Sequence, residues 1–394
     1  MAVWRCITLT STLLSASLLT SFGFAAPASD ASNRAIATSE VSEVSRPRAR
    51  DIGIAPGILT PGPLNAITDV DGVLVGHVTL SDGQAINTGA TAILPHGGNL
   101  YRDRVPAGFH QGNGYGKFAG STQVIELGEL ETPIILTNTL SVPRGMEAAI
   151  SWTLKQLGNE DVRSVNAVVG ETNDGYLNDI RGRHLRAETI ETAITSAKTG
   201  PVEEGSVGAG RGTISFGWKG GIGTSSRVLP SALGSYTVGV LAQTNYGGIL
   251  SVDGVPVGRM LDQYFMKDTL DEGDADGSVI IVIATDAPLS DRNLERLASR
   301  AMLGIGRTGS PVTNGSGDYI LAFSTAESVR RGANRVPSNG LDNGELSPLF
   351  QAVVEATEEA ILNALFKATS VSGHRGTIDA IDIEAVTRIM AGER

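Results

Sequence analysis

Cysteine is nearly absent from this chain of 394 residues, since its one cysteine, Cys6, lies within the first 28 residues. A chain with a single cysteine cannot form an internal disulfide, so its stability must come from a packed core, and this length suffices to bury one. A second long apolar run, internal repeats and heptads are missing as well. These absences exclude a multi-span membrane protein, a solenoid and a coiled coil.

Basic residues are too few to balance the acidic ones. The chain has 31 lysines and arginines against 42 aspartates and glutamates, which gives a formal net charge of −11. A negative chain is poorly suited to nucleic acid or to an anionic membrane surface. We therefore expect neither of these as a partner.

Residues 1–28 have the features of a secretory signal peptide. Arg5 is their only charged residue, an uncharged run covers residues 7–24, and small residues around 23–25 or 26–28 offer a cleavage site. A membrane anchor is the alternative interpretation. The sequence thus predicts a periplasmic or secreted protein that does not associate with the membrane once the signal is removed.

The rest of the chain is predicted to hold one domain behind a polar arm. Residues 29–58 are polar and lack periodicity, and the run Arg-Pro-Arg-Ala-Arg occupies 46–50. This composition indicates an N-terminal arm. Residues 59–394 are predicted to form the single domain.

Apolar patterning in that domain predicts strands and helices in mixed order. Two strands joined by a turn at Asp71-Gly72 are expected over 66–79. Further strands are expected at 91–94, 134–139, 165–169, 236–245, 279–284 and 319–325. Helices are expected at 145–157, 188–197, 290–304 and 346–369. Because the order shows no regular βαβ alternation, it favours a layered α/β sandwich over a doubly wound sheet or a barrel.

Glycine is concentrated in one segment, residues 205–223, which holds eight of the 49 glycines. That density is too high for a helix and predicts tight turns and bulged strands. The glycines at 208, 210 and 212 do not have the spacing of a dinucleotide-binding loop.

Familiar catalytic motifs are missing. The sequence has no G-x-S-x-G elbow, no H-E-x-x-H and no P-loop. Its five histidines are scattered singly, so we interpret them as surface or structural residues: His77, His96, His110, His184 and His374. No metal ion or cofactor is predicted, and a hydrolase of this composition would need a base other than histidine.

One junction in the sequence could supply that base. An acidic, glycine-containing loop at 271–277 is followed by the apolar run Val279–Ala284, which predicts a strand buried on both faces. Ser278, fixed by that strand, could attack the carbonyl of Gly277 and form an ester that water cleaves. The released amine, with a pKa near 8, could then take the hydroxyl proton of the same serine. On pattern alone, an ordinary turn serine is the commoner explanation.

Seven stretches of the chain resemble the L-aminopeptidase/D-amidase/D-esterase family, which includes the β-peptidyl aminopeptidases. They are residues 65–77, 112–124, 131–141, 173–183, 220–226, 276–288 and 314–318. The resemblance implies a four-layer αββα sandwich with mixed sheets and self-cleavage into portions 59–277 and 278–394. It also implies a homo-oligomer of the processed protomers.

The resemblance also implies roles for individual residues. Ser278 matches the nucleophile released by cleavage after Gly277. Ser316 is similar to a second serine that hydrogen-bonds the nucleophile and relays a proton, and Asp318 matches an acidic partner that some members replace with glutamate. Without the resemblance, 314–318 would be an ordinary turn rich in asparagine, glycine and serine.

Two further residues match donors to the oxyanion. Asn245 would contribute its side-chain amide and Tyr176 its hydroxyl, although capping a turn and packing are the simpler explanations. Recognition of the substrate's ammonium needs a carboxylate, for which Asp174 and Asp179 are equal candidates.

These expectations together describe an exported aminopeptidase or amidase. Its substrates would be L-, D- or β-aminoacyl amides, esters and short peptides. One alternative is an acyltransferase of the related αββα fold, although those enzymes use threonine at the position of Ser278. The other alternative is an unprocessed periplasmic binding protein.

Overall fold

The computed structural model of this protein describes residues 46–267, 277–332 and 340–393. The predicted signal peptide, most of the arm and the acidic loop at 271–276 lie outside these residues. Contacts between Cα atoms group Ser45–Arg394 into one compact unit. Within the described ranges, no helix has the length and apolar character needed to cross a bilayer.

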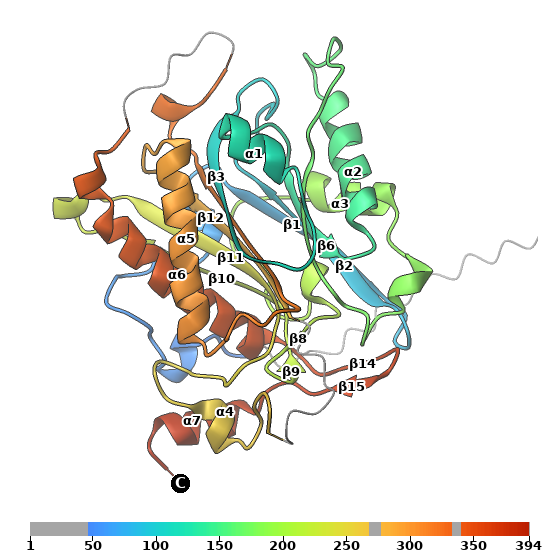
Figure 1. Ribbon diagram of the computed structural model, residues 1–394, viewed down its shortest axis with the longest axis vertical. Helices are drawn as coiled ribbons and strands as arrows, with labels where there is room; N and C mark the ends of the chain where they lie inside the picture. Colours follow the sequence, from blue (N-terminus) through green and yellow to red (C-terminus); the bar gives the residue numbers. More distant parts are fainter. Residues whose placement is uncertain (1–45, 268–276, 333–339, 394) are drawn as a thin grey trace, which may run out of the picture. The chain divides into compact units, whose positions relative to one another are not determined.

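Two mixed β-sheets form the centre of this unit (Figure 1). The five-stranded sheet has the order β1 (Leu74–Ser81), β2 (Asn87–Leu94), β6 (Ile134–Asn138), β7 (Val168–Thr172) and β4 (Phe118–Ala119). The six-stranded sheet has the order β10 (Ile222–Val228), β11 (Thr237–Asn245), β12 (Ser278–Thr285), β13 (Gly317–Ser324), β3 (Val105–Gly114) and β5 (Glu129–Leu130).

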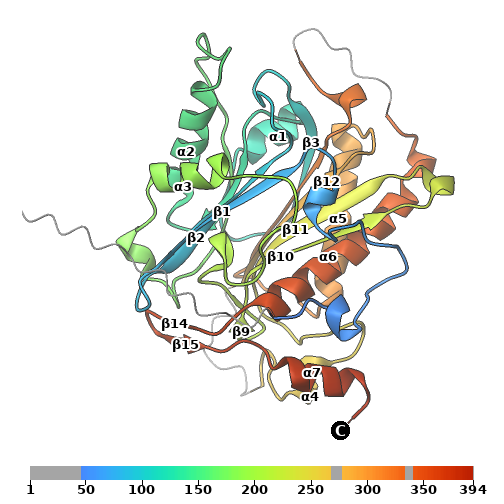
Figure 2. The ribbon, with the colours of Figure 1, turned by 180° about the vertical axis from the view of Figure 1, so that it is seen from behind.

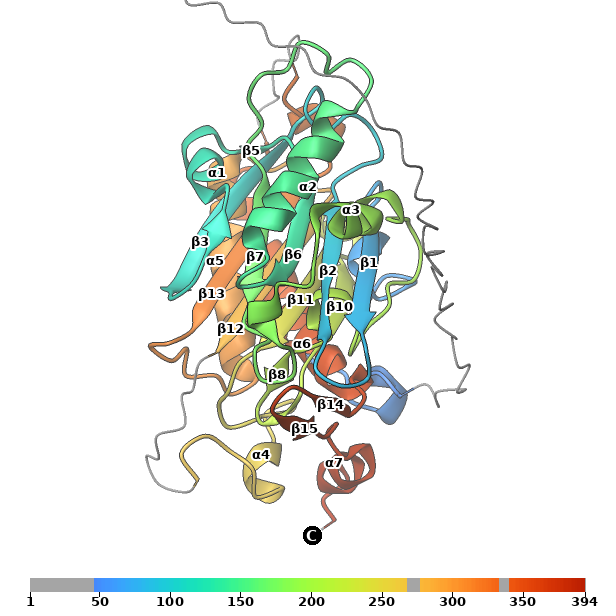
Figure 3. The ribbon, with the colours of Figure 1, turned by 90° about the vertical axis from the view of Figure 1, so that its right-hand side faces the viewer.

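Helices cover the outer face of each sheet. Helices α2 (Val142–Leu154) and α3 (Ala187–Thr195) pack on the five-stranded sheet, and α5 (Asp291–Arg307) and α6 (Ser347–Lys367) pack on the six-stranded one. The view in Figure 2 and the edge-on view in Figure 3 show the resulting layers of helix, sheet, sheet and helix. The four-layer αββα sandwich predicted from the sequence is thus confirmed.

Shorter elements lie around the ends of the sheets. The helices among them are α1 (Ser121–Leu127), α4 (Val257–Met260) and α7 (Ile383–Met390). Two small hairpins join β8 (Ile214–Ser215) to β9 (Trp218–Lys219), and β14 (Val371–Gly373) to β15 (Gly376–Ile378).

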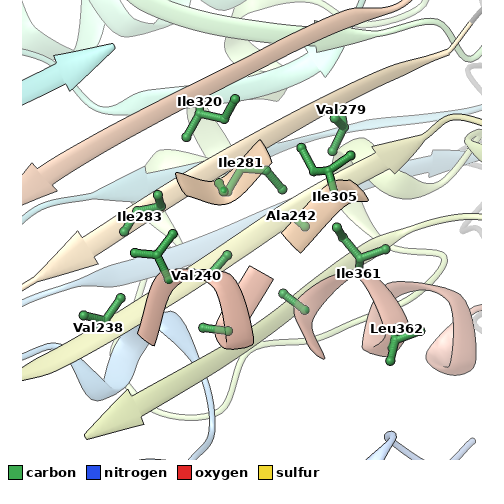
Figure 4. Close-up of a cluster of buried hydrophobic side chains, with 14 of the residues drawn as sticks. Val238, Val240, Ala242, Val279, Ile281, Ile283, Ile305, Ile320, Ile361 and Leu362 are labelled. Carbon is green, nitrogen blue, oxygen red and sulfur yellow. The ribbon is translucent and has the colours of Figure 1, made fainter. Parts of the chain in front are cut away.

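Strand β12 is buried along its whole length, because side chains on both of its faces are covered. Val279, Ile281 and Ile283 belong to the core under α5 and α6 (Figure 4). The alternate residues, from Ile280 to Ala284, belong to the core between the two sheets. Such two-sided burial explains the uninterrupted apolar run and confirms the predicted strand. Truncating Ile281 to alanine would cost about 2–5 kcal/mol of folding free energy.

The hairpin predicted over residues 66–79 is correct for one of its two strands and wrong for the other. Only its second strand, β1, exists, and Ile67–Asp69 forms a 3-10 helix. The Asp69 carboxylate accepts the backbone N–H groups of Leu64 and Ala66, at 2.9 and 3.0 Å. These bonds fold the segment locally, so its backbone is not available for strand pairing.

The end of the predicted arm packs against the domain. Arg46 donates to the carbonyl oxygens of Phe366 and Ile381, and the Arg50 guanidinium lies 2.9 Å from the carboxylate of Glu359 on α6. The compact unit therefore begins near Ser45, ahead of the expected boundary at residue 59.

A buried ion network joins β10 to α6. Arg227, on β10, lies 3.1 Å from a carboxylate oxygen of Glu355 and 2.8 Å from one of Glu359, and all three side chains are fully buried. Removing one partner from such a network leaves a buried charge uncompensated, which costs about 3–5 kcal/mol.

Candidate active site

Ser278 is the first residue of β12, a central strand of the six-stranded sheet. Its neighbour across the antiparallel ladder with β11 is Asn245, and its neighbour across the parallel ladder with β13 is Gly317. Ser316 and Asp318 flank Gly317 in the sequence. Sheet register alone therefore brings four of the predicted site residues to one end of the sheet.

The peptide bond before Ser278 is held in close contact with these neighbours. The Ser278 hydroxyl lies 2.6 Å from the carbonyl oxygen of Gly277, and that oxygen also accepts the backbone N–H of Gly317 at 3.2 Å. A Cβ atom at residue 277 would lie 2.9 Å from Cβ of Tyr246 and 3.2 Å from Oγ of Ser316. Glycine is thus required for steric reasons, and the Ser316 hydroxyl lies beside the Gly277–Ser278 bond.

Ser316 and Asp318 form a hydrogen-bonded pair. The Ser316 hydroxyl donates to Oδ1 of Asp318 at 2.7 Å, and both residues are 2% exposed. Burial raises the pKa of Asp318 to about 6, with the bond from Ser316 acting in the opposite direction. Within the described residues, Oδ2 of Asp318 is buried without a hydrogen-bond partner. This carboxylate is consequently a better proton acceptor than an exposed aspartate.

Asn245 ends strand β11 with its carboxamide in a fixed orientation. Its Oδ1 accepts the backbone N–H of Ile214 at 3.0 Å. Because the oxygen is occupied in this way, the nitrogen is the end of the amide that can donate to another group. That arrangement suits a donor to a developing negative charge near Ser278.

Tyr176 belongs to the loop after β7 and not to the six-stranded sheet that carries Ser278. Its side chain is 42% exposed, and its hydroxyl lies beside Gly376, where a Cβ atom would be 3.0 Å away. Its backbone carbonyl accepts the N–H of Arg375 at 3.0 Å. Its role as a second oxyanion donor stays a prediction.

A small cavity of about 70 Å³ opens beside Ser278. Its lining residues are Tyr115, Gly116, Lys117, Thr139, Glu171, Asn173, Gly277, Ser278 and Gly315. Glu171, a carboxylate only 4% exposed, is the one buried acidic residue among them. A buried carboxylate that lines the same cavity as Ser278 is suited to hold a cationic group of a ligand.

Glu171 was missed by the sequence analysis. Its Oε1 accepts the backbone N–H of Lys117 at 3.0 Å, with the Lys117 ammonium 3.6 Å away, and its Oε2 accepts the hydroxyl of Thr139. The available signal was a carboxylate near the end of β7, in the sequence Val-Val-Gly-Glu-Thr, two residues before the Asn173-Asp-Gly-Tyr motif.

Neither aspartate considered for the ammonium site is among the cavity's lining residues. Asp174 is 2% exposed, and its two oxygens accept hydrogen bonds from Thr88 and Asn178. Burial raises its pKa to about 6. Asp179 caps the 3-10 helix at 180–182 and lies 3.3 Å from His184. Both carboxylates serve local structure.

Metal ligands are not clustered in the described ranges: no group of three or more histidine, cysteine, aspartate or glutamate side chains is placed to hold an ion. Independence from metal and cofactor stays a prediction from the sequence.

Comparisons with known proteins agree with this geometry. The profile of Peptidase family S58 matches residues 65–378. Beta-peptidyl aminopeptidase BapA of Sphingosinicella microcystinivorans is 42% identical over 356 residues, which cover 84% of this chain and 88% of that protein. The protein of the same name from Sphingosinicella xenopeptidilytica is 39% identical over 378 residues, covering 90% and 94%.

Among solved structures, the L-aminopeptidase D-Ala-esterase/amidase of Ochrobactrum anthropi is similar with a TM-score of 0.79. It is 36% identical, and the match covers 88% of this chain and 99% of that one. That structure is described as a prototype for the serine aminopeptidases and as a variant of the Ntn hydrolase fold.

Fold, site and comparisons define the class as a serine-type aminopeptidase or amidase. The resemblance seen in the sequence motifs is therefore confirmed. The chain belongs to peptidase family S58.

Proposed function

We propose that this enzyme hydrolyses the amide bond after a small N-terminal residue, with β-amino acids as the first substrate class to test. Self-cleavage at Gly277–Ser278 would release the nucleophile. The observation that carries the proposal is the Ser278 hydroxyl, 2.6 Å from the Gly277 carbonyl oxygen at the wall of a cavity lined by Glu171. Two relatives about 40% identical are named beta-peptidyl aminopeptidases, which supports the choice of substrate.

Self-cleavage begins when Oγ of Ser278 attacks the carbonyl carbon of Gly277. Asp318 takes the hydroxyl proton through Ser316, and the N–H of Gly317 stabilises the charge on the carbonyl oxygen. The C–N bond then breaks, the proton passes to the released amine, and an ester links the two residues. Water hydrolyses this ester, leaving a carboxylate on Gly277 and a free amine on Ser278.

Hydrolysis of a substrate reuses the same hydroxyl with a new base. The α-amine of Ser278, with a pKa near 8 when unperturbed, accepts the proton as Oγ attacks the substrate carbonyl. Asn245 donates to the oxyanion, the leaving amine is protonated, and water releases the acyl group.

Glu171 would select substrates with a free N-terminus. Its buried carboxylate attracts the substrate's ammonium, and the cavity of about 70 Å³ limits the size of the first residue. An N-acylated peptide lacks this charge, so it should be a poor substrate.

The location and assembly of the enzyme are part of the same proposal. The apolar run within residues 1–28 supports export to the periplasm or the medium. The resemblance of the chain to enzymes made of processed protomers supports a homo-oligomer.

One experiment tests the central proposal. The purified protein should run as two fragments on a denaturing gel, with the smaller beginning Ser-Val-Ile-Ile, and should release chromophore from aminoacyl anilides. Ser278→Ala should give an uncut, inactive chain, whereas Ser278→Cys should still cleave but hydrolyse substrates poorly. An active protein that remained a single intact chain would overturn the N-terminal-serine mechanism, and an uncut, inactive wild type would favour a binding protein.

A further inference from the structure

The glycine-rich segment 205–223 forms a small scaffold next to the oxyanion donor. Within it, β8 and β9 form a hairpin whose turn uses positive φ angles at Phe216 and Gly217, 54° and 83°. At the base of this hairpin, Ile214 lies directly opposite Lys219. Ile214 is the residue whose backbone N–H fixes the carboxamide of Asn245.

Lys219 is fully buried without a carboxylate in ion-pair distance in the part of the chain that the structure describes. Its Nζ instead donates to the carbonyl oxygens of Gly210 and Gly220, at 2.8 and 2.7 Å. Burying an amine in this way is unfavourable unless its hydrogen bonds are needed, because a methionine of similar shape would pack at lower cost. The two hydrogen bonds to carbonyl oxygens therefore account for a lysine at this buried position.

Those bonds close the loop that carries Ile214. The hydroxyl of Thr213 also donates to the Gly210 carbonyl at 3.0 Å, and the N–H of Gly220 donates to the Thr213 carbonyl at 3.0 Å. Lys219 and Thr213, the residue preceding Ile214, thus form hydrogen bonds with the same two residues, Gly210 and Gly220. Hydrogen bonds and the Thr213–Ile214 peptide unit together connect the buried amine to the carboxamide of Asn245.

We propose that Lys219 is a positioning residue for the oxyanion donor. By holding the base of the hairpin, it keeps the Ile214 N–H on Oδ1 of Asn245 and so directs the amide nitrogen toward the reacting carbonyl. Lys219 itself touches neither substrate nor nucleophile. The inference rests on the oxyanion role proposed above for Asn245.

The kinetic test compares Lys219→Met with Asn245→Ala and with the double variant. Lys219→Met should lower kcat by about tenfold with little change in KM, because a misaligned donor loses part of its transition-state stabilisation. The double variant should have the kcat of Asn245→Ala alone. Lys219→Gln retains an NH₂ group that can donate to both carbonyls, so it should recover part of the loss. If the two single losses multiplied in the double variant, the proposal would be overturned.

A second readout does not depend on activity. Hydrogen exchange of the Ile214 amide should be faster in Lys219→Met than in the wild-type processed enzyme, and intermediate in Lys219→Gln. The control is Leu362→Ala in the core under α6, which should lower Tm but leave both kcat and Ile214 exchange unchanged. Unchanged exchange at Ile214 in both Lys219 variants would overturn the proposal even if activity fell. If Lys219→Met does not fold, the Lys219→Gln comparison decides the question, whereas a wild type without hydrolysis would count against the proposed function instead.

Discussion

Asn245 and Ser278 lie directly opposite each other where the antiparallel ladder of β11 and β12 ends. This pairing places the carboxamide next to Ser278 through sheet register, and the backbone N–H of Ile214 fixes its orientation. Sites built on sheet register in this way are held more rigidly than sites assembled from loops.

Replacing Asn245 with alanine should affect turnover and leave binding almost unchanged. The amide is proposed to stabilise charge that exists only in the transition state, so kcat should fall by about two to three orders of magnitude while KM stays nearly constant. Steady-state kinetics on an aminoacyl anilide would measure both values. An increase in KM with normal turnover would make Asn245 a binding residue.

Self-cleavage should slow as the pH falls through the pKa of Asp318, which burial raises to about 6. Below that value the carboxyl group is protonated and cannot accept the proton from Ser316, and above it the group is ionised. Precursor from a short cell-free synthesis can be moved into buffers from about pH 4.5 to about pH 8, a range that brackets this titration. Denaturing gels would then give the cleavage rate at each pH.

Variants at Asp318 supply the control for that profile. Asp318→Asn should stay uncut at every pH, whereas Asp318→Glu should cleave, because it keeps the acid. A wild-type rate that did not change across the titration range would argue against Asp318 as the base.

Glu171→Gln should weaken binding of substrates that carry a free amine. The substitution keeps the size of the side chain but removes the buried charge, so KM should rise by about 30-fold or more, equivalent to about 2 kcal/mol. Self-cleavage involves no ammonium and should proceed normally. The matched control is Asp179→Asn, which should leave KM unchanged. If Asp179→Asn raised KM and Glu171→Gln left it unchanged, Asp179 would be the ammonium site instead.

Lys117→Met should lower KM, whereas Glu171→Gln should raise it. The Lys117 ammonium lies 3.6 Å from the Glu171 carboxylate, so it would compete with the substrate's ammonium for that carboxylate. The lysine side chain is 53% exposed, so the gain is small, and KM should fall by no more than about fivefold. Lys155→Met, which removes an exposed ion pair with Glu191, serves as the control. A higher KM in Lys117→Met would show that the lysine helps to bind the substrate.

The apolar pattern of the sequence predicted a strand most clearly where both faces of that strand are buried. The apolar run after Ser278 predicted β12 because a strand covered on both faces has no polar positions to confuse the pattern. Strands β3 and β10 were not predicted, since their glycines, polar residues and the buried Arg227 resemble loop sequence. These two strands are buried by contacts with segments distant in the sequence, which the local sequence does not reveal.

Residues that meet only in three dimensions were the hardest to predict. Glu171 belongs to the five-stranded sheet and Ser278 to the six-stranded one, so nothing in their spacing indicates a shared cavity. The arginines of 46–50 look solvated in sequence, yet Arg50 pairs with a glutamate buried on α6. Both cases depend on contacts between segments far apart in the chain.

The order of strands in the six-stranded sheet also has a consequence for the two products of cleavage. Strands β12 and β13 would belong to the smaller polypeptide, yet they lie between β11 and β3 of the larger one. The buried contact of Arg227 with Glu355 and Glu359 would cross the same divide. A cut at Gly277 would therefore produce interlocked halves that stay associated on dilution and behave as a single particle, separating only when the whole sandwich unfolds.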